Sequence, residues 1–431
     1  SASNDTLTNE SAYNGLVFTG AVKTESGKAH LVAPAGTTIE VPVKAGQNVN
    51  VGYYYQADFT VNGQTVTSNS GSTSKFESSD FTANADGTLT ITVNTLTYFT
   101  GITVGTKVPY AENIYVGADK EYKTINDALA AVRLMDRPNS ERVTINVDPG
   151  DYQEMLVIDV DNVTLKNTAA NPDTALINKG VNITENGVRV TSYYIHGYNY
   201  FSMTDDCKYD EEVLKTNKEN GYLSFENPGS GTTKNSYWNA TVTVRGTGFE
   251  ADGIIFENSA NQYISTKEAN DVVQEWTVGG KGTRPTTAGD TSVQNKSFVE
   301  RAAAIAILGD KAYFNNCKFV GRQDTLYGAS NIRAAFNKCT AMGGTDFIFG
   351  GMVATFYKSD IMMNTSEDNN DVAYLTAAQQ ASGRGYLMYD CNVVSTTPGV
   401  DTASEYVSKP GYFGRPWQAT TSEVAFVNTT V

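Results

Sequence analysis

Two consecutive stretches of the sequence, AYFNNCKFVGRQDTLYG (312–328) and AAFNKCTAMGGTDFIFG (334–350), align with each other without gaps. The matched positions share alanine, phenylalanine, asparagine, cysteine, glycine and aspartate. Fainter copies of the pattern occur at 160–168, 248–259, 355–360 and 385–394. A strand-rich repeat of this length with no helix inside it predicts a parallel β-helix, in which each coil buries its face against its neighbours.

The repeat makes a geometric prediction about Asp324 and Asp346, which occupy matched positions. Equivalent residues on adjacent coils stack roughly 4.8 Å apart, so the two carboxyl groups should lie side by side on one face. Two carboxylates that close do not readily ionise together, so one should keep its proton and act as an acid. By the same spacing Cys317 stacks on Cys339, either as a disulfide or as a pair of buried thiols.

The residues around the two aspartates favour a catalytic role for them over a purely structural role in a turn. Aromatic side chains adjoin both of them, and Gln323 is a neutral donor beside the first. Farther on, the GRPW segment (414–417) supplies a guanidinium and an indole. A carboxylate, an acid, an amide donor and a guanidinium form an esterase site without histidine. The alternative is that both aspartates are polar residues of a stacked solenoid turn.

Composition restricts the function further. The chain of 431 residues is 40% hydrophobic and 11% aromatic, as expected of a globular protein with more than one domain. Its net charge of -15 argues against a nucleic-acid partner. It contains two histidines, and its four cysteines have no CxxC spacing. We therefore expect catalysis by carboxylates, with no metal, no cofactor and no transmembrane helix.

The first part of the chain differs from the repeat region. Residues 1–108 contain short alternating segments, and the dipeptides Asn62-Gly63 and Asp86-Gly87 predict hairpin turns between them. This pattern predicts a small accessory β-sandwich, a spacer or a weak carbohydrate binder. Its aromatic run Tyr53-Tyr54-Tyr55 could stack on sugars or could be ordinary sandwich packing.

A domain boundary is expected near residue 108, followed by a β-helix domain over 109–431. Just after that boundary one helix is predicted, with Thr124 as its N-cap. Its apolar residues recur at helical spacing at positions Ile125, Ala128, Leu129 and Val132. The whole chain is therefore predicted to be all-β apart from short helices.

Four segments resemble the signature blocks of pectin methylesterases, and they stand in that family's order. They are GDYQE (150–154), GRQDTLYG (321–328), GTDFIFG (344–350) and GRPW (414–417). KTINDALAAV (123–132) resembles the family's opening helix, and 239–260 its first full coil. The resemblance covers about residues 109–431. It implies a right-handed parallel β-helix that hydrolyses the galacturonate methyl esters of pectin to free carboxylate and methanol.

The resemblance also implies roles for individual residues. Asp346 would be the nucleophile, and Asp324 the acid that protonates the departing methanol and then the base for water. Gln323 would donate to the oxyanion, Arg415 would keep Asp346 ionised and oriented, and Trp417 would line the groove. Further substrate contacts are expected from Tyr327, Phe347 and Ser259. The block containing Gly150, Tyr152 and Glu154 is expected to be structural.

Three features depart from the family pattern. The segment ERAAAI (300–305) places Arg301 where a second oxyanion glutamine is expected, so Arg301 is a candidate donor and substrate contact. Segments 198–235 and 263–298, with Trp238 and Trp276 near or within them, look like insertions that form cleft walls. The chain also ends at Val431, soon after Trp417, so we expect the family's closing coils to be absent or replaced.

The compartment and partners follow from composition and resemblance. Low Lys and Arg content with abundant Ser, Thr, Asn and Gly is typical of an extracellular bacterial protein, free or attached to the cell surface. The first residues lack signal-peptide features, so a signal would have been removed or lie outside this sequence. We expect a monomer acting on pectin. The alternatives are a β-helical lyase or hydrolase of acidic polysaccharide, and a non-catalytic adhesin.

Overall fold

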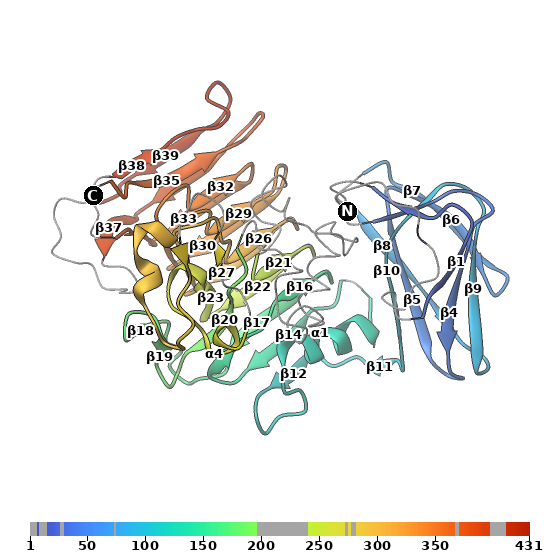
Figure 1. The fold of residues 1–431 in the computed structure, drawn as a ribbon. Coiled ribbons are helices and arrows are strands. Elements are labelled where there is room, and N and C mark those ends of the chain that lie inside the picture. The colour runs from blue at the N-terminus through green and yellow to red at the C-terminus, as the bar shows by residue number, and fades with distance from the viewer. Residues whose placement is uncertain are drawn as a thin grey trace. The chain divides into compact units, whose positions relative to one another are not determined.

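A computed structural model gives the fold of the chain, which contains antiparallel sheets in its first part and parallel sheets in the rest (Figure 1). The structure describes residues 7, 15–25, 30–72, 75–138, 140–195, 240–271, 275–276, 282–366, 370–396 and 411–431. The predicted insertion at 198–235 and Trp238 lie outside these residues.

The first part of the chain is a sandwich of two five-stranded antiparallel sheets, as predicted. One sheet consists, in spatial order, of β1 (Val17–Thr19), β4 (Thr38–Val43), β9 (Gly87–Val93), β6 (Gln56–Val61) and β7 (Gln64–Asn69). The other consists of β2 (Lys23–Thr24), β3 (Leu31–Ala33), β10 (Thr97–Gly105), β5 (Asn48–Tyr54) and β8 (Phe76–Thr82). Alternate residues of both sheets, such as Ile39 and Val51, form one buried apolar core.

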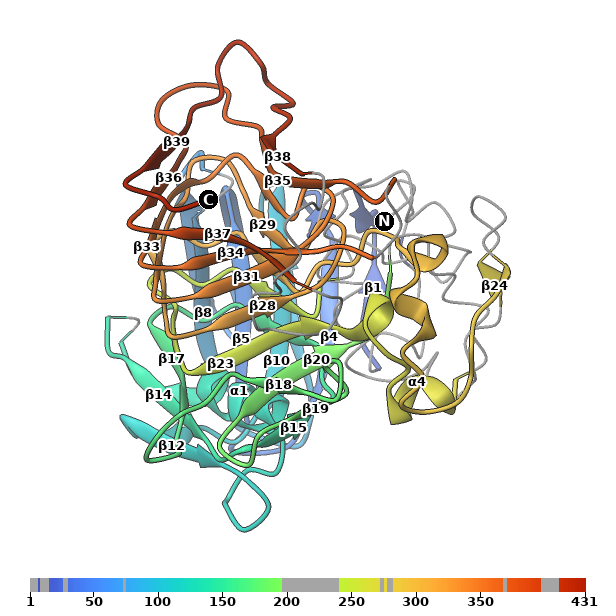
Figure 2. The same cartoon turned by 90° about the vertical axis from the view of Figure 1, so that its left-hand side faces the viewer.

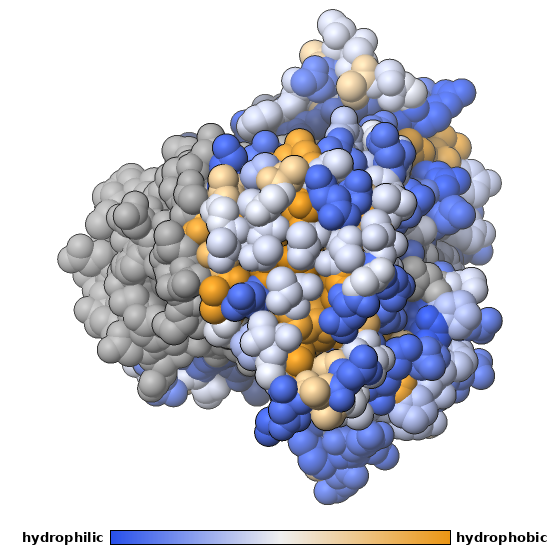
Figure 3. Space-filling view, turned by 90° about the vertical axis from the view of Figure 1, so that its right-hand side faces the viewer, coloured by the Kyte–Doolittle hydropathy of each residue, from blue (hydrophilic) through white to orange (hydrophobic). Residues whose placement is uncertain are grey.

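The outward face of the β1-β4-β9-β6-β7 sheet is rich in threonine. Thr38 and Thr92 are paired across β4 and β9, and Glu40 is paired with Thr90. These residues alternate with core residues, so they point away from the sandwich core. Figure 3 views this side of the sandwich, where weakly hydrophilic residues surround smaller hydrophobic areas.

The two predicted hairpin dipeptides have different outcomes. Asn62-Gly63 joins β6 to β7 in a two-residue turn, with φ of 50° and 79°. Positive φ at both turn residues is the geometry that favours Asn-Gly, so this hairpin is confirmed. Asp86-Gly87 was expected to join paired strands, and this is wrong. It connects β8 to β9, which belong to opposite sheets.

The predicted helix is confirmed as α1 (Ile125–Leu134). The Oγ1 atom of Thr124 accepts a hydrogen bond from the Asp127 N–H at 3.0 Å, as expected of an N-cap. The two carboxylate oxygens of Glu154 accept the N–H groups of Ile125 and Asn126, both at 2.9 Å. Glu154 therefore completes the cap of a helix that lies well before it in the chain, which gives the GDYQE block a structural role.

The second part is a parallel β-helix with three sheets, which confirms the predicted fold class (Figure 2). Its nine-stranded sheet comprises β12 (Asn113–Val116), β14 (Val143–Val147), β17 (Val163–Asn167), β22 (Glu250–Asp252), β27 (Ala312–Asn315), β30 (Arg333–Asn337), β33 (Val353–Tyr357), β36 (Tyr386–Tyr389) and β39 (Val424–Val427). The second sheet comprises β15 (Gly150–Tyr152), β20 (Val188–Ser192), β23 (Ile254–Asn258), β28 (Lys318–Val320), β31 (Thr340–Gly343), β34 (Asp360–Asn364) and β37 (Asn392–Thr396). The third sheet comprises β16 (Leu156–Ile158), β21 (Val242–Val244), β26 (Ile305–Ile307), β29 (Leu326–Gly328), β32 (Ile348–Gly350), β35 (Ala373–Ala378) and β38 (Gly411–Gly414).

The repeat register is the one that the sequence predicts. Phe314 pairs with Phe336 in the nine-stranded sheet, Phe319 with Ala341 in the second, and Leu326 with Ile348 in the third, so the offset of the sequence repeat holds in all three sheets. Inside the coil the rings of Phe314, Phe336 and Phe356 stack, with centroids 5.0 and 4.3 Å apart. We call the turn from the nine-stranded to the second sheet the first corner, and the turn from the second to the third sheet the second corner.

The cysteines of the repeat are thiols. Cys317, Cys339 and Cys391 are buried and free, which decides between the two predicted alternatives in favour of a thiol ladder. Burial raises the pKa of the Cys317 thiol well above its ordinary value. These thiols therefore pack as small apolar groups.

Shorter elements interrupt the coils. Strand β11 (Val108–Pro109) pairs with β13 (Met135–Asp136), so the chain returns to the predicted boundary after α1. Two further strand pairs are β18 (Leu176–Ile177) with β19 (Asn182–Ile183), and β24 (Glu275–Trp276) with β25 (Gly282–Thr283). The insertion predicted at 263–298 contains α4 (Thr266–Ala269) and the short 3-10 helices η5 (Ser292–Gln294) and η6 (Lys296–Phe298), while η4 (Ser259–Asn261) precedes it.

Candidate active site

Asp324 and Asp346 occupy equivalent places at the second corner of adjacent coils. Strands β28 and β31 precede them and β29 and β32 follow, and both strand pairs are in direct register. Between the coils, the Asp324 N–H donates to the Thr345 carbonyl at 3.0 Å. The two carboxyl groups are therefore neighbours across one inter-strand spacing of about 4.8 Å.

Both aspartates adopt a backbone conformation that side chains rarely take. Their φ angles are 59° for Asp324 and 53° for Asp346, in the left-handed region. Both are almost completely buried, with 5% and 3% of their surface exposed. Buried carboxyl groups in a strained turn are costly unless other groups compensate, and such costs concentrate at functional sites.

Arg415 supplies that compensation for Asp346. Strand β38, which ends at Gly414, lies beside β35, and β35 lies beside β32. From the end of β38, Arg415 donates from Nε and Nη2 to the two carboxylate oxygens of Asp346, both at 2.6 Å. The hydrogen bond to Asp346 raises the pKa of Arg415. A bidentate pair of this kind fixes the orientation of the Asp346 carboxyl group.

Tyr374 contacts both the turn that carries Asp346 and the side chain of Arg415. The sequence pattern does not identify this residue. Its N–H donates to the Gly344 carbonyl at 3.0 Å, and its carbonyl accepts the Phe347 N–H at 3.4 Å, so it brackets the turn that carries Asp346. Its ring lies 4.6 Å from Cζ of Arg415, and Tyr412 stacks on it at 5.3 Å. The sequence hides Tyr374 because it stands more than one repeat beyond Asp346, outside the two aligned stretches.

Arg301 lies one coil before Asp324, side by side with Gln323, which directly precedes Asp324 in the chain. A parallel β-bridge joins them, and the Ala302 N–H donates to the Gln323 carbonyl at 3.1 Å. This confirms the predicted register at Arg301. By Ile305, which pairs with Leu326, the register has shifted, so the coil is irregular just beyond. Both side chains are partly exposed beside the aspartate turn, where they can meet a ligand.

A buried ion pair stabilises the turn that carries Gln323 and Asp324. Arg322, 1% exposed, donates to Asp371 at 2.7 Å and to the Gln294 carbonyl at 2.8 Å. Burial lowers the pKa of Arg322, and Asp371 opposes this effect. Gln294 belongs to the insertion at 263–298, so that insertion contacts the coil of Asp324. The idea that it forms a cleft wall stays a prediction.

Aromatic side chains flank the site at the third sheet. The Trp417 N–H donates to the Ala378 carbonyl at 2.9 Å, and the indole is 63% exposed. The partly exposed Tyr327 packs on Phe349 with ring centroids 5.0 Å apart. These two residues therefore offer aromatic surface to a ligand, which agrees with their expected place in a groove.

Two predicted substrate contacts are corrected. Phe347 has no exposed surface and packs inside the coil. Ser259 is also fully buried, and its hydroxyl donates to the Ser192 carbonyl at 3.2 Å. The repeat pattern places both beside the functional turn but does not reveal which way they point. We leave Phe347 and Ser259 out of the site.

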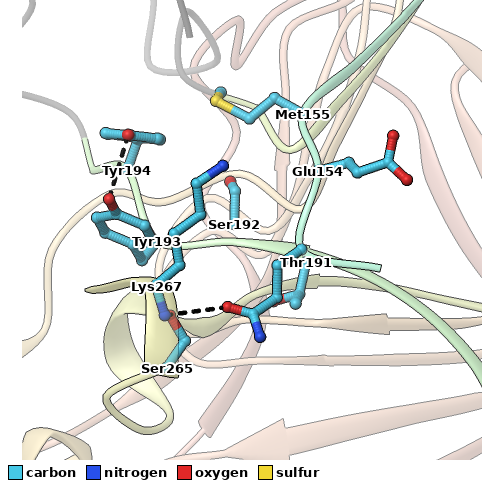
Figure 4. A pocket seen from close by; sticks show the side chains of 9 residues that line it. Glu154, Met155, Thr191, Ser192, Tyr193, Tyr194, Ser265 and Lys267 are labelled. Atoms are coloured by element: carbon cyan, nitrogen blue, oxygen red, sulfur yellow. Dashed lines mark hydrogen bonds between the residues drawn. The ribbon is translucent and has the colours of Figure 1, made fainter. Parts of the chain in front are cut away.

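A small pocket lies at the second corner of earlier coils, away from the two aspartates (Figure 4). Tyr193 and Tyr194 line it with stacked rings 4.5 Å apart, and their hydroxyls share a hydrogen bond of 3.2 Å. Lys267 from the insertion donates its N–H to Gln153 at 3.2 Å. Glu154, also in the lining, caps α1. These contacts join the insertion to the first coils, which is a structural role.

The site thus consists of a carboxylate held by a guanidinium, a second buried carboxyl group on the next coil, and two partly exposed donors beside them. Carboxylate nucleophile, acid and oxyanion donors are what ester hydrolysis without histidine requires. The class of protein is therefore a parallel β-helix with a carboxylate-based site.

Comparisons with known proteins agree with this class. A family model described as Pectinesterase matches residues 266–431. Over 212 residues the chain is 30% identical to a probable pectinesterase A of Neosartorya fischeri, covering 48% of this chain and 49% of that one. Over 154 residues it is 29% identical to a probable pectinesterase/pectinesterase inhibitor 64 of Arabidopsis thaliana, covering 33% and 25%. The chain spans between a quarter and a half of the length of these two curated relatives.

Among solved structures, the chain is similar to pectin methylesterase PemA from Erwinia chrysanthemi. The sequence identity is 21% and the TM-score 0.48, with 74% of this chain and 79% of that chain covered.

Proposed function

We propose that this protein is a pectin methylesterase that hydrolyses the galacturonate methyl esters of pectin. The observation that carries the proposal is the bidentate Asp346–Arg415 pair beside Asp324 on the adjacent coil. The match of residues 266–431 to the pectinesterase family supports the choice of substrate, because both aspartates and Arg415 lie within it.

In the first step, a carboxylate oxygen of Asp346 attacks the carbonyl carbon of the methyl ester. The carbonyl oxygen becomes an oxyanion, which Gln323 and Arg301 stabilise by donating hydrogen bonds. When the tetrahedral intermediate collapses, the bond to the methoxy oxygen breaks and Asp324 gives that oxygen its proton. The products of this step are methanol and an anhydride between Asp346 and the galacturonyl group.

In the second step, the ionised Asp324 takes a proton from water as the water attacks the galacturonyl carbonyl. The Asp346 carboxylate leaves, the galacturonyl group becomes a free carboxylic acid that releases its proton to solvent, and Asp324 is protonated again. Arg415 acts throughout by orienting Asp346, and its charge makes that carboxylate a good leaving group in this step. Trp417 and Tyr327 contact the sugar chain.

The remaining assignments belong to the same proposal. Residues 109–431 would be the catalytic domain and 1–108 an accessory sandwich. The protein would act outside the cell as a monomer. Within the described residues, no helix combines the length and apolar character needed to cross a membrane.

Methanol release from highly methyl-esterified pectin tests the function and separates the alternatives. The expected result is one methanol for each new carboxylate, with no loss of polymer length. Chain cleavage without methanol would instead support a hydrolase or lyase. Binding with neither product would support an adhesin.

A further inference from the structure

An aromatic cluster lies on the outward face of the second sandwich sheet, in a part of the chain to which the esterase chemistry assigns no role. In β5, Val49, Val51 and Tyr53 belong to the sandwich core. Because successive strand residues point to opposite faces, Tyr54 points outward. Its cross-strand partner in β8 is Phe76, which is outward for the same reason.

Four rings from three strands and an adjoining turn make up this cluster. Tyr54 stacks on Phe76 with centroids 5.5 Å apart and an interplanar angle of 10°. Tyr98 meets Tyr54 edge-on at 5.9 Å and Tyr55 edge-on at 5.6 Å. Phe76 is 41% exposed and Tyr55 37% exposed, whereas Tyr54 is buried beneath them. The cluster therefore presents two exposed rings on a packed base.

Polar groups hold the base of the cluster in place. The Tyr54 hydroxyl shares a hydrogen bond of 2.5 Å with Nδ1 of His30, and His30 Nε2 shares one of 2.8 Å with Glu25. His30 itself is only 4% exposed. Burial raises the pKa of Tyr54 to about 12, so its phenol stays neutral at ordinary pH. A neutral, hydrogen-bonded ring is a rigid support for the exposed ones.

Tyr55 has a strained backbone. Its φ is 65°, a left-handed value that is unusual for a bulky residue. The Gly71 N–H donates to its carbonyl at 3.0 Å, and this contact helps to hold the turn. Strain of this kind persists where surrounding structure enforces it, and here it exposes an aromatic ring to solvent.

Beside the rings, the same outward face becomes polar. Gly52 faces Ser78 across β5 and β8, next to the Tyr54–Phe76 pair. Beyond it, the amide of Asn50 donates to Ser78 at 3.2 Å and to Asp80 at 3.0 Å. The Thr100 side chain lies over this step, because a Cβ at position 52 would come within 2.6 Å of its Oγ1. Aromatic rings beside a row of hydroxyl, amide and carboxylate groups suit a sugar ring, which has apolar faces and hydroxyl edges.

We propose that this surface, formed by Tyr55, Phe76, Tyr98, Ser78 and Asn50, binds a stretch of methyl-esterified galacturonan. The exposed rings contact the apolar face of a sugar, and the Asn50 row meets its hydroxyl groups. The identity of the polymer rests on the proposed esterase function. The charge of the surface favours the esterified form, because two carboxylates border it: Glu25 bonds to His30 beneath the rings, and Asp80 accepts the Asn50 amide.

The test measures retention of the full chain on immobilised pectin. An Asp346→Asn background prevents de-esterification during the measurement. The replacements Tyr55→Ala and Phe76→Ala together should weaken binding to esterified galacturonan about three- to tenfold. Phe76→Leu keeps apolar packing against Tyr54 but lacks a ring, so it should also weaken binding. Val104→Ala is the control, since Val104 is 36% exposed and lies at the opposite end of β10.

Three polymers identify the ligand: esterified galacturonan, fully de-esterified polygalacturonate and a neutral galactan. The proposal expects the first to bind best and to show the loss in the ring variants. Equal binding by all variants, or stronger binding of polygalacturonate or galactan, would overturn it. With Asp346 intact, the ring variants should release methanol from a short esterified oligosaccharide at the normal rate. Absence of methanol in every variant would refute the esterase function and leave the binding result to stand by itself.

Discussion

The two corners of the β-helix use the same backbone conformation for different purposes. At the first corner, one residue per coil has positive φ on five successive coils: Asn316, Lys338, Lys358, Asp390 and Asn428. At the second corner, Asp324 and Asp346 have it on two adjacent coils. The conformation is therefore a property of tight solenoid turns and does not by itself identify a site.

What differs is the surroundings of each corner. Behind the first corner, buried Cys317, Cys339, Ser359 and Cys391 follow the left-handed residues and bond to backbone carbonyls. The left-handed residues themselves vary, and Lys338 and Lys358 are exposed. At the second corner both residues are buried carboxyl groups, and one has a guanidinium partner. The buried carboxyl groups and their guanidinium partner therefore identify the proposed catalytic site, whereas the left-handed backbone conformation alone does not.

The largest expected effect comes from Asp346→Asn, compared with Lys338→Asn in the same coil. An asparagine amide cannot form the anhydride intermediate, so methanol release should fall by roughly 10⁴-fold or more. Lys338→Asn places the same residue in the same backbone conformation at the first corner and should leave the rate unchanged. If Asp346→Asn kept activity within tenfold of wild type, it would show that Asp346 is not the nucleophile.

Asp324→Asn should have the next largest effect, with Asn316→Asp as its matched change in the same coil. Without its acid, methoxide is a poor leaving group, and the rate should fall by roughly 10²–10⁴-fold. Esters with activated leaving groups need no acid, so their first step should be much less affected. Equal losses on methyl and activated esters would argue against an acid role. Asn316→Asp should change neither rate.

Tyr374→Leu tests the ring that packs on Arg415, and the first corner offers a comparable pair. There Lys358 Nζ lies 5.2 Å from the Tyr357 ring centroid. Removing the Tyr374 ring should lower kcat about tenfold, because a partly buried cation–π contact contributes about 1–2 kcal/mol to the placement of Arg415. KM should change little. Tyr357→Leu should leave both constants unchanged, and an equal loss in both variants would contradict the positioning role.

The smallest expected effect is on stability at the first corner. Lys338→Gly relieves the cost of a left-handed side chain, about 1–2 kcal/mol, but loses about 0.5–1 kcal/mol of backbone entropy. The midpoint of thermal unfolding should therefore stay the same or rise slightly, with unchanged methanol release. A marked fall in the midpoint would show that the Lys338 side chain stabilises the coil, and the first corner would no longer serve as a neutral reference.

The sequence predicts the coils well because their spacing is regular. The repeat places Asp324 against Asp346 and Arg301 against Gln323, and the strands have these registers. The repeat does not predict contacts where the length of a coil changes, and therefore it does not place Tyr374 beside Asp346. It also fails where direction matters: Phe347 follows a catalytic candidate in sequence but points into the core. In the sandwich, Asp86-Gly87 predicts a turn correctly but not that the chain changes sheets there.

The most direct test of the account traps the acylated aspartate. In Asp324→Asn, an activated galacturonate ester should acylate Asp346 without needing an acid, while hydrolysis of the anhydride is slow for lack of a base. Borohydride reduces an acylated aspartate to homoserine, which peptide mapping by mass spectrometry can locate. The account predicts homoserine at position 346, dependent on the ester. Homoserine at another position, or steady ester turnover with position 346 unmodified, would contradict it.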